Sequence, residues 1–236
     1  MPRPYCLKTL LVLAAWGACV PLNAGARETE PVAGPEPSAH FHPQGQPPSP
    51  ATVALQHSAR SSLPFEDKRD FDESKRGFIA APTYTEINTA DGAPAWNFNR
   101  YAFLDTKQDF DSIHPSLQRQ AVLNAQYGLY EVVPGRIWQV RGFDISNITF
   151  VKGDSGWIVF DPLVSKETAA AALAFANDKI GARPVVAVIY SHSHIDHFGG
   201  VRGVIDEADV KTGKVQVIAP AGFMEAAISE NVYAGN

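Results

Sequence analysis

The feature that most constrains the fold of this chain is an apolar stretch that runs into a cluster of metal-binding side chains. Residues 185–190 read Val-Val-Ala-Val-Ile-Tyr, which predicts a buried strand. Residues 192–197 read His-Ser-His-Ile-Asp-His. The side chains in this run that can bind a metal ion are His192, His194, Asp196 and His197. Open α/β sheets commonly build their sites just beyond a strand end, so a metal site is predicted there.

The spacing of the four side chains divides them into two pairs. In an extended chain, alternate residues project to the same side, so His192 and His194 can bind one ion. Asp196 and His197 follow the bend and can bind a second ion or hold a water. Imidazole nitrogen with carboxylate oxygen suits Zn²⁺ best, with iron and manganese as alternatives. The other interpretation is a solvated polar turn with chance histidines.

Two glycines follow the cluster, and the combined segment has a known counterpart. Gly199-Gly200 allows close backbone packing near the ions. The segment from 185 to 200 resembles the metallo-β-lactamase superfamily of dinuclear hydrolases, whose substrates include lactams, thioesters, lactones, phosphodiesters and sulfate esters. Further segments resemble bacterial alkylsulfatases, and the resemblance extends over about residues 58–236. These segments are 62–67, 70–72, 76–80, 198–203, 220–224 and 229–236.

The resemblance implies a fold, a reaction and roles for the predicted ligands. The fold would be α/β, the N-terminal half of an αβ/βα sandwich preceded by an N-terminal extension. The reaction would be zinc-dependent hydrolysis of linear alkyl sulfates, such as dodecyl sulfate, to alcohol and sulfate. His192 and His194 would bind the first of two zinc ions, and Asp196 and His197 the second. Asp196 would also be catalytic, by orienting or deprotonating the attacking water. A full-length enzyme would be a homodimer.

The N-terminus has the pattern of a cleaved export signal. Residues 1–26 combine a basic start, an apolar stretch and a small-residue site near Ala26. Cleavage would remove both cysteines, Cys6 and Cys19, and two basic residues from a chain whose formal net charge is already −5. We therefore expect a periplasmic or secreted protein with no disulfide and no integral membrane span. Its acidic balance argues against nucleic-acid and anionic-membrane partners and leaves a small molecule, an alkyl sulfate, as the expected partner.

Composition divides the rest of the chain into three parts. Residues 27–57 are rich in proline and predict a disordered tether, in which His40-Phe41-His42 is not expected to bind metal. Residues 58–134 form the N-terminal extension, and residues 135–236 the incomplete metallo-β-lactamase-like domain. Helices are predicted at 66–75, 115–127 (capped by Asp111-Ser112), 166–180 and from 221 to 229, and strands at 137–140, 147–151, 157–160, 185–190 and 214–219.

Several interpretations stay open at the level of sequence. The aromatic residues of the extension either pack it onto the catalytic domain or form a surface for a fatty tail: Phe65, Phe71, Phe78, Trp96, Phe98, Tyr101 and Phe103. Asp161 is either a hydrogen-bond partner of a ligating histidine or a turn residue before Pro162. Arg202 binds sulfate or lies on a helix surface.

The number of ligands bears on whether this chain can turn over a substrate. A catalytic zinc usually has about three protein ligands, and no histidine follows His197 in the sequence. The resemblance implies further ligands well downstream, and neither Glu225 nor Glu230 is expected to serve. The alternatives to an alkylsulfatase are another hydrolase of the superfamily and an inactive metal-binding fragment.

Overall fold

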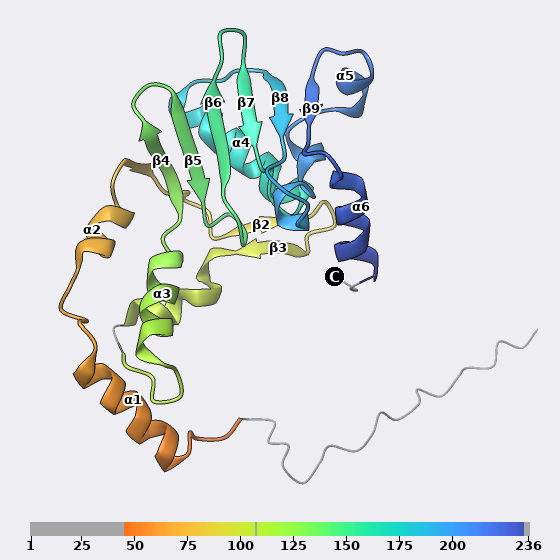
Figure 1. Ribbon diagram of the computed structural model, residues 1–236. Helices are drawn as coiled ribbons and strands as arrows, with labels where there is room; N and C mark the ends of the chain where they lie inside the picture. The colour runs from red at the N-terminus through yellow and green to blue at the C-terminus, as the bar shows by residue number, and fades with distance from the viewer. Residues whose placement is uncertain (1–44, 107, 234–236) are drawn as a thin grey trace, which may run out of the picture. The chain divides into compact units, whose positions relative to one another are not determined.

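The computed structural model describes residues 45–106 and 108–233 of the chain. The segment predicted as a signal peptide, residues 1–26, lies outside the described residues, as does His40-Phe41-His42. Residues 47–236 form a unit of their own. Its larger sheet has the strand order β1-β4-β5-β6-β7-β8-β9, and β2 pairs with β3 in a separate hairpin (Figure 1).

The bounds of the elements are as follows. The strands of the larger sheet are β1 (Phe78–Ala80), β4 (Gly128–Val133), β5 (Ile137–Arg141), β6 (Ile148–Lys152), β7 (Trp157–Phe160), β8 (Val185–Ile189) and β9 (Gln216–Ile218). The hairpin strands are β2 (Glu86–Asn88) and β3 (Pro94–Asn97). The α-helices are α1 (Pro50–Ser62), α2 (Arg69–Ser74), α3 (Pro115–Asn124), α4 (Lys166–Ile180), α5 (Glu207–Lys211) and α6 (Phe223–Ile228). Shorter helical segments are η1 (Phe98–Thr106), η2 (Ile195–His197), η3 (Val201–Gly203) and η4 (Ser229–Tyr233).

The sheet changes from antiparallel to parallel at β7. Strands β1, β4, β5, β6 and β7 pair antiparallel in turn, whereas β7–β8 and β8–β9 are parallel. Parallel neighbours need a crossover connection, and α4 supplies it between β7 and β8 (Figure 1). Because β7, β8 and β9 are parallel, their carboxyl ends lie at the same edge of the sheet. The metal-binding sequence begins at this edge, directly after β8. The predicted mixed α/β architecture is confirmed.

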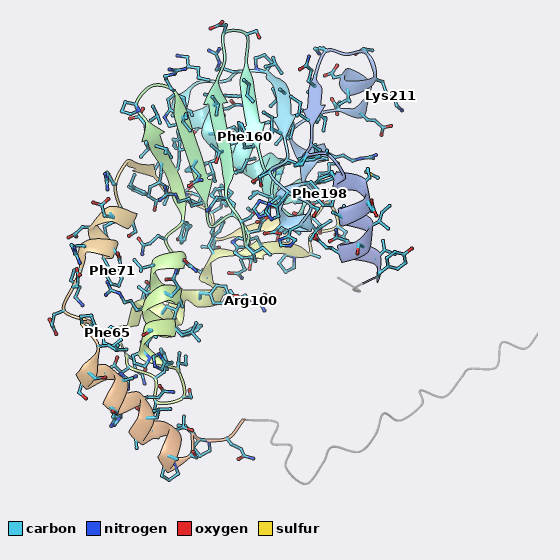
Figure 2. All side chains as sticks on the ribbon, viewed as in Figure 1. Phe65, Phe71, Arg100, Phe160, Phe198 and Lys211 are labelled. Carbon is cyan, nitrogen blue, oxygen red and sulfur yellow. The ribbon has the colours of Figure 1, made fainter. Side chains whose placement is uncertain are left out.

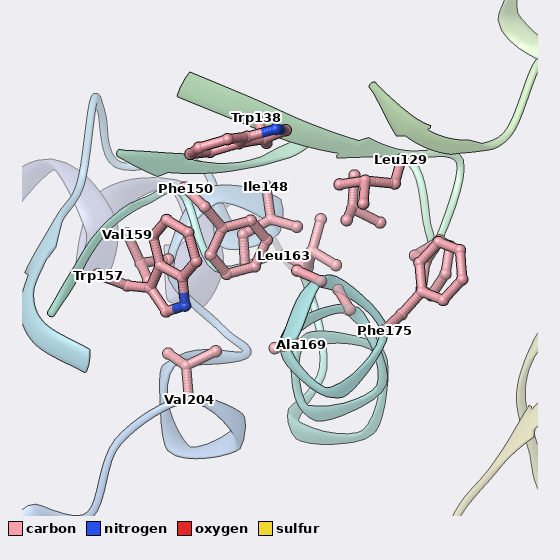
Figure 3. Packing of buried hydrophobic residues seen from close by; sticks show 14 of the residues in the cluster. Leu129, Trp138, Ile148, Phe150, Trp157, Val159, Leu163, Ala169, Phe175 and Val204 are labelled. Carbon is pink, nitrogen blue, oxygen red and sulfur yellow. The ribbon is translucent and has the colours of Figure 1, made fainter. Parts of the chain in front are cut away.

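The core lies between the sheet and α4. On β5, β6 and β7 alternate residues are buried, so one face of the sheet presents Trp138, Phe150 and Trp157 to the interior (Figure 3). Alanines on α4 let the helix approach this face closely, and Phe175 fills the remaining space. The Trp157 indole Nε1–H donates to Asn177 Oδ1 of the same helix at 2.8 Å, so the polar atom of the largest core side chain is satisfied.

Residues 50–57 differ from the predicted tether. The structure shows α1 there, starting at Pro50, because Ser49 Oγ accepts a hydrogen bond from the Thr52 amide and proline is compatible with the first helical turn. The cap predicted for the second helix of the extension is also wrong: His114, not Asp111-Ser112, caps α3 through Nδ1, which accepts from the Ser116 amide.

The extension is not a separate layer, because it contributes to the main sheet. Strands β1 and β4 both precede residue 135; β1 pairs with β4, and β4 pairs with β5. Phe98 is buried against Tyr127 and Phe143, and the Trp96 Nε1–H donates to the Gly142 carbonyl at 2.9 Å. The predicted packing role therefore holds for these two aromatic side chains, whereas Tyr101 remains about half exposed. In residues 45–106 and 108–233, no helix has the length and apolar character needed to cross a membrane.

Candidate metal site

The predicted ligands lie where the sequence placed them, at the end of β8. Strand β8 ends at Ile189, the loop 191–194 follows, and η2 carries the last three residues of the cluster. Phe198, labelled in Figure 2, lies between the end of β8 and α6, where its ring packs against Tyr190 and Phe223. This aromatic contact holds the loop against the start of α6.

The structure brings the four predicted ligands together as two pairs. His192 Nε2 lies 3.1 Å from His194 Nδ1, and His197 Nε2 lies 3.2 Å from Asp196 Oδ2. The two pairs are neighbours, since the rings of His192 and His197 have centroids 4.1 Å apart. Two ligands of one tetrahedral zinc, each about 2.1 Å from the ion, are about 3.4 Å apart. Each pair therefore has the separation that a shared zinc ion requires.

The hydrogen bonds around the cluster favour one tautomer of His197 and of His192. Asp161 Oδ2 accepts from His197 Nδ1 at 2.9 Å, which leaves the lone pair of that ring on Nε2. The Ser191 hydroxyl donates to the same carboxylate at 2.6 Å, so its oxygen can accept from His192 Nδ1, which lies 2.9 Å away. The lone pair of His192 is then also on Nε2. An imidazole in this tautomer binds a metal ion through Nε2.

Asp161 is both a turn residue and a hydrogen-bond partner of His197. Its backbone adopts a positive φ of 54°, which is uncommon for a residue other than glycine and marks the sharp turn after β7. The same turn aims the carboxylate at the loop after β8, where Oδ1 accepts from the Ser191 amide at 2.7 Å. The turn residue and the partner of the histidine are therefore one residue.

Each pair supplies fewer donors than a catalytic zinc usually has. Within the part of the chain that the structure describes, no three His, Cys, Asp or Glu side chains converge on one point as a metal site would require. The donor types and the separations within each pair fit zinc, but two protein ligands for each ion is one short of the usual three.

Glu230 does not supply the missing ligand in this arrangement. Its Oε2 accepts from Ser193 Oγ at 3.0 Å and lies 3.8 Å from His194 Nε2, the nitrogen on the opposite side of the ring from the His192 contact. Glu225 is exposed on α6. Arg202 pairs with Glu207 at 2.9 Å on the surface, which supports its surface interpretation rather than sulfate binding.

Two residues that support the cluster were not predicted from the sequence. Asp144, in the loop between β5 and β6, accepts from the Val164 amide at 2.9 Å and from Thr168 Oγ1 at 2.8 Å. It also accepts from the Ser146 amide, and Ser146 Oγ donates to the Asp196 carbonyl at 2.5 Å. Burial raises the pKa of Asp144 above its usual value, although these hydrogen bonds act in the opposite direction. The only local signal was an Asp-x-Ser turn sequence.

Gly199 and Gly200 permit a close approach between the metal-binding loop and the backbone of residues 162–164. A Cβ on Gly199 would lie 2.3 Å from the Val164 carbonyl oxygen, and one on Gly200 would lie 2.1 Å from the Pro162 oxygen. The Gly200 amide donates to the Leu163 carbonyl at 2.8 Å. The two glycines therefore allow the metal-binding loop to pack directly against the turn that contains Asp161.

Comparison with known proteins agrees with this geometry. Residues 141–236 match the metallo-beta-lactamase superfamily. The chain is 50% identical over 190 residues to an (R)-specific secondary-alkylsulfatase of a Pseudomonas species and 43% identical over 187 residues to an alkyl/aryl-sulfatase of Saccharomyces cerevisiae. These matches cover 80% and 79% of this chain, but only 28% and 29% of the two relatives.

A solved structure gives the same result in three dimensions. The stereoselective inverting sec-alkylsulfatase Pisa1 from Pseudomonas superposes with a TM-score of 0.75 at 50% identity, over 80% of this chain and 30% of that protein. The resemblance to alkylsulfatases expected from the sequence is therefore confirmed, and with it the fold. The chain has the metallo-β-lactamase fold and is homologous, over 80% of its length, to part of the alkylsulfatases of that superfamily.

Proposed function

We propose that this chain carries part of the active site of a zinc-dependent hydrolase of linear alkyl sulfate esters. The supporting observation is the pairing of His192 with His194 and of Asp196 with His197 at the separations that zinc ligands have. The chain that carries these pairs is 50% identical over 190 residues to an (R)-specific secondary-alkylsulfatase. The products would be an alcohol and inorganic sulfate.

The residues of the site have two kinds of role, metal binding and proton transfer. Bound zinc supplies a Lewis acid that lowers the pKa of water towards neutrality. His192 and His194 would hold one ion and Asp196 and His197 the other, and Asp161 orients His197 through its Nδ1 hydrogen bond. The Asp196 carboxylate, whose Oδ2 lies 3.2 Å from His197 Nε2, would also orient the attacking water or accept its proton.

The test is sulfate release from dodecyl sulfate by the full chain supplied with zinc, with and without a chelator. We expect release that the chelator abolishes, and loss of release in His194→Ala. His57→Ala is the matched control, because His57 is an exposed histidine on α1 that contacts Asp111 rather than the cluster. Sulfate release that is equal in His194→Ala and in the parent chain would refute the assignment.

The second candidate is metal binding without turnover. It is favoured by the absence of a third converging donor among the described residues. Zinc would then bind to the parent chain and weakly or not at all to His194→Ala, while no sulfate appears with either. Measuring bound zinc by competition with a coloured chelator, in parallel with the sulfate assay, separates the two candidates.

The place of action is also a proposal. The basic and apolar character of residues 1–26 supports export with cleavage near Ala26, to the periplasm or the medium. N-terminal sequencing of the protein recovered outside the cytoplasm would test this, and an intact Met1 would contradict it.

A further inference from the structure

The segment formed by α6 and η4 is attached to the metal-binding loop at both of its ends. Phe223, at the start of α6, stacks on Tyr190 with ring centroids 5.3 Å apart. At the other end, the side-chain amide of Asn231 on η4 donates to the Ser193 carbonyl at 3.4 Å. The second attachment point therefore lies inside the cluster of predicted ligands.

Glu230, also on η4, places its carboxylate beside the first pair of ligands. Its Oε2 accepts a hydrogen bond from Ser193 Oγ at 3.0 Å and lies 3.8 Å from His194 Nε2. The second distance is too long for a hydrogen bond, but the charge of a carboxylate acts on the ring across it. The hydrogen bond from Ser193 holds this carboxylate oxygen next to the ring.

The contact of Glu230 has a counterpart in the second pair of ligands. There, Asp161 contacts His197 at Nδ1, which leaves Nε2 for the ion. In His194 the two nitrogens are exchanged: Nδ1 lies 3.1 Å from His192, and Nε2 is the nitrogen next to the carboxylate. Glu230 therefore has the same relation to the first pair that Asp161 has to the second.

The charge of Glu230 discriminates between the two tautomers of His194. A carboxylate has no proton to donate and repels a lone pair, so it favours a proton on Nε2 and a lone pair on Nδ1. In the other tautomer, the Nδ1–H would donate to His192 Nε2, 3.1 Å away. That hydrogen bond would occupy both facing nitrogens of the first pair. The tautomer that Glu230 favours leaves Nδ1 able to bind an ion.

We infer that Glu230 is a positioning residue for the first pair of metal ligands, because it selects the tautomer of His194 in which Nδ1 binds the ion. The inference rests on the metal-binding part of the proposed function. Loss of such a partner of a metal ligand typically weakens metal binding about 10–100-fold. The side chains of His194 and Glu230 are 61% and 37% exposed, so water weakens their interaction and the lower end of this range is expected.

The test compares Glu230→Gln with the parent chain. Glutamine keeps the size of the side chain and an oxygen that can accept from Ser193, but it lacks the charge, and its amide can donate to Nε2. The metal-free full chain is examined by long-range proton–nitrogen NMR at about pH 8.5, at which histidine is ordinarily neutral. Nδ1 of His194 should be unprotonated in the parent and protonated in Glu230→Gln. Zinc affinity, measured by competition with a coloured chelator, should fall about tenfold.

Glu225→Gln is the matched control, because it removes the same charge from an exposed position on α6. It should keep the tautomer and the zinc affinity of the parent, and equal melting temperatures would confirm that both variants are folded. A protonated Nδ1 in the parent, an unprotonated Nδ1 in Glu230→Gln, or an equal loss of zinc affinity in Glu225→Gln would overturn the inference. The expected change of tautomer, in a chain that releases no sulfate, would support the role of Glu230 and contradict the proposed hydrolysis.

Discussion

Replacing Gly200 with alanine tests whether the metal-binding loop is held by direct backbone contact. The added Cβ would lie 2.1 Å from the Pro162 oxygen, 2.5 Å from the Ser165 oxygen and 2.8 Å from the Ala169 Cβ. The shortest of these is more than about 1 Å inside ordinary van der Waals separation. The backbone angles of Gly200, φ −83° and ψ 4°, are open to alanine, so any cost comes from the clash and not from the conformation.

The expected loss follows from how little the neighbours can move. Two of the three contacts are backbone carbonyls, and Pro162 and Leu163 are fully buried. Overpacking of this kind costs about 3 kcal/mol, and reduced freedom of the unfolded chain returns about 1 kcal/mol. A net loss of about 2 kcal/mol lowers the melting temperature by about 4–8 °C in a chain of this size. Displacement of the loop should also weaken zinc binding.

The assay is thermal unfolding followed by circular dichroism, with zinc affinity measured on the same samples. Gly213→Ala is the comparison, because Gly213 has a positive φ of 76° and open space around its Cβ. It should lose about 1 kcal/mol from backbone strain alone and keep its zinc affinity. A Gly200→Ala protein with the parent's melting temperature and zinc affinity would refute the close-contact reasoning.

Three further predictions concern other parts of the structure. Ser165→Ala removes the side-chain acceptor that caps α4 and should cost about 1 kcal/mol in urea unfolding, and no change in the midpoint would contradict the cap. Asn177→Ala leaves the buried Trp157 Nε1–H without its acceptor and should cost about 1–3 kcal/mol, whereas a neutral result would mean that water replaces the amide. Hydrogen bonds from Arg69 lower the pKa of Asp67 to about 2. This pairing therefore favours folding above about pH 4, and its contribution is lost as the pH falls towards 2. Carboxyl NMR titration should show the pKa of Asp67 returning towards 3.8 in Arg69→Gln, and an unchanged pKa would contradict the pairing.

Local sequence signals predicted the elements that line the core. The strand at 157–160 and the helix at 166–180 match the structure, because an apolar run after a turn and an alanine-rich segment are local signals. The pairing of His192 with His194 follows from their i, i+2 spacing. In each case, the residues that decide the outcome are within a few positions of one another in the chain.

The predictions that failed, and the residues that were missed, involve signals of a different kind. Helix α1 was hidden by the proline content of the segment before it, although Ser49-Pro50 is itself a helix start. Asp144 and Ser146 reach partners 20 and 50 residues away in the chain, and no spacing rule connects such residues. The membership of β1 and β4 in the main sheet likewise depends on pairing and not on composition.

The loop 142–147 connects the metal-binding loop to the turn after β7 and to α4. Its carboxylate, Asp144, binds the amide of Val164 in the turn after β7 and the hydroxyl of Thr168 on α4, so the loop cannot shift without breaking buried hydrogen bonds. Its Ser146 hydroxyl donates to the Asp196 carbonyl. The position of Asp196 therefore depends on this one buried carboxylate. A change at Asp144 should consequently alter metal binding as well as stability.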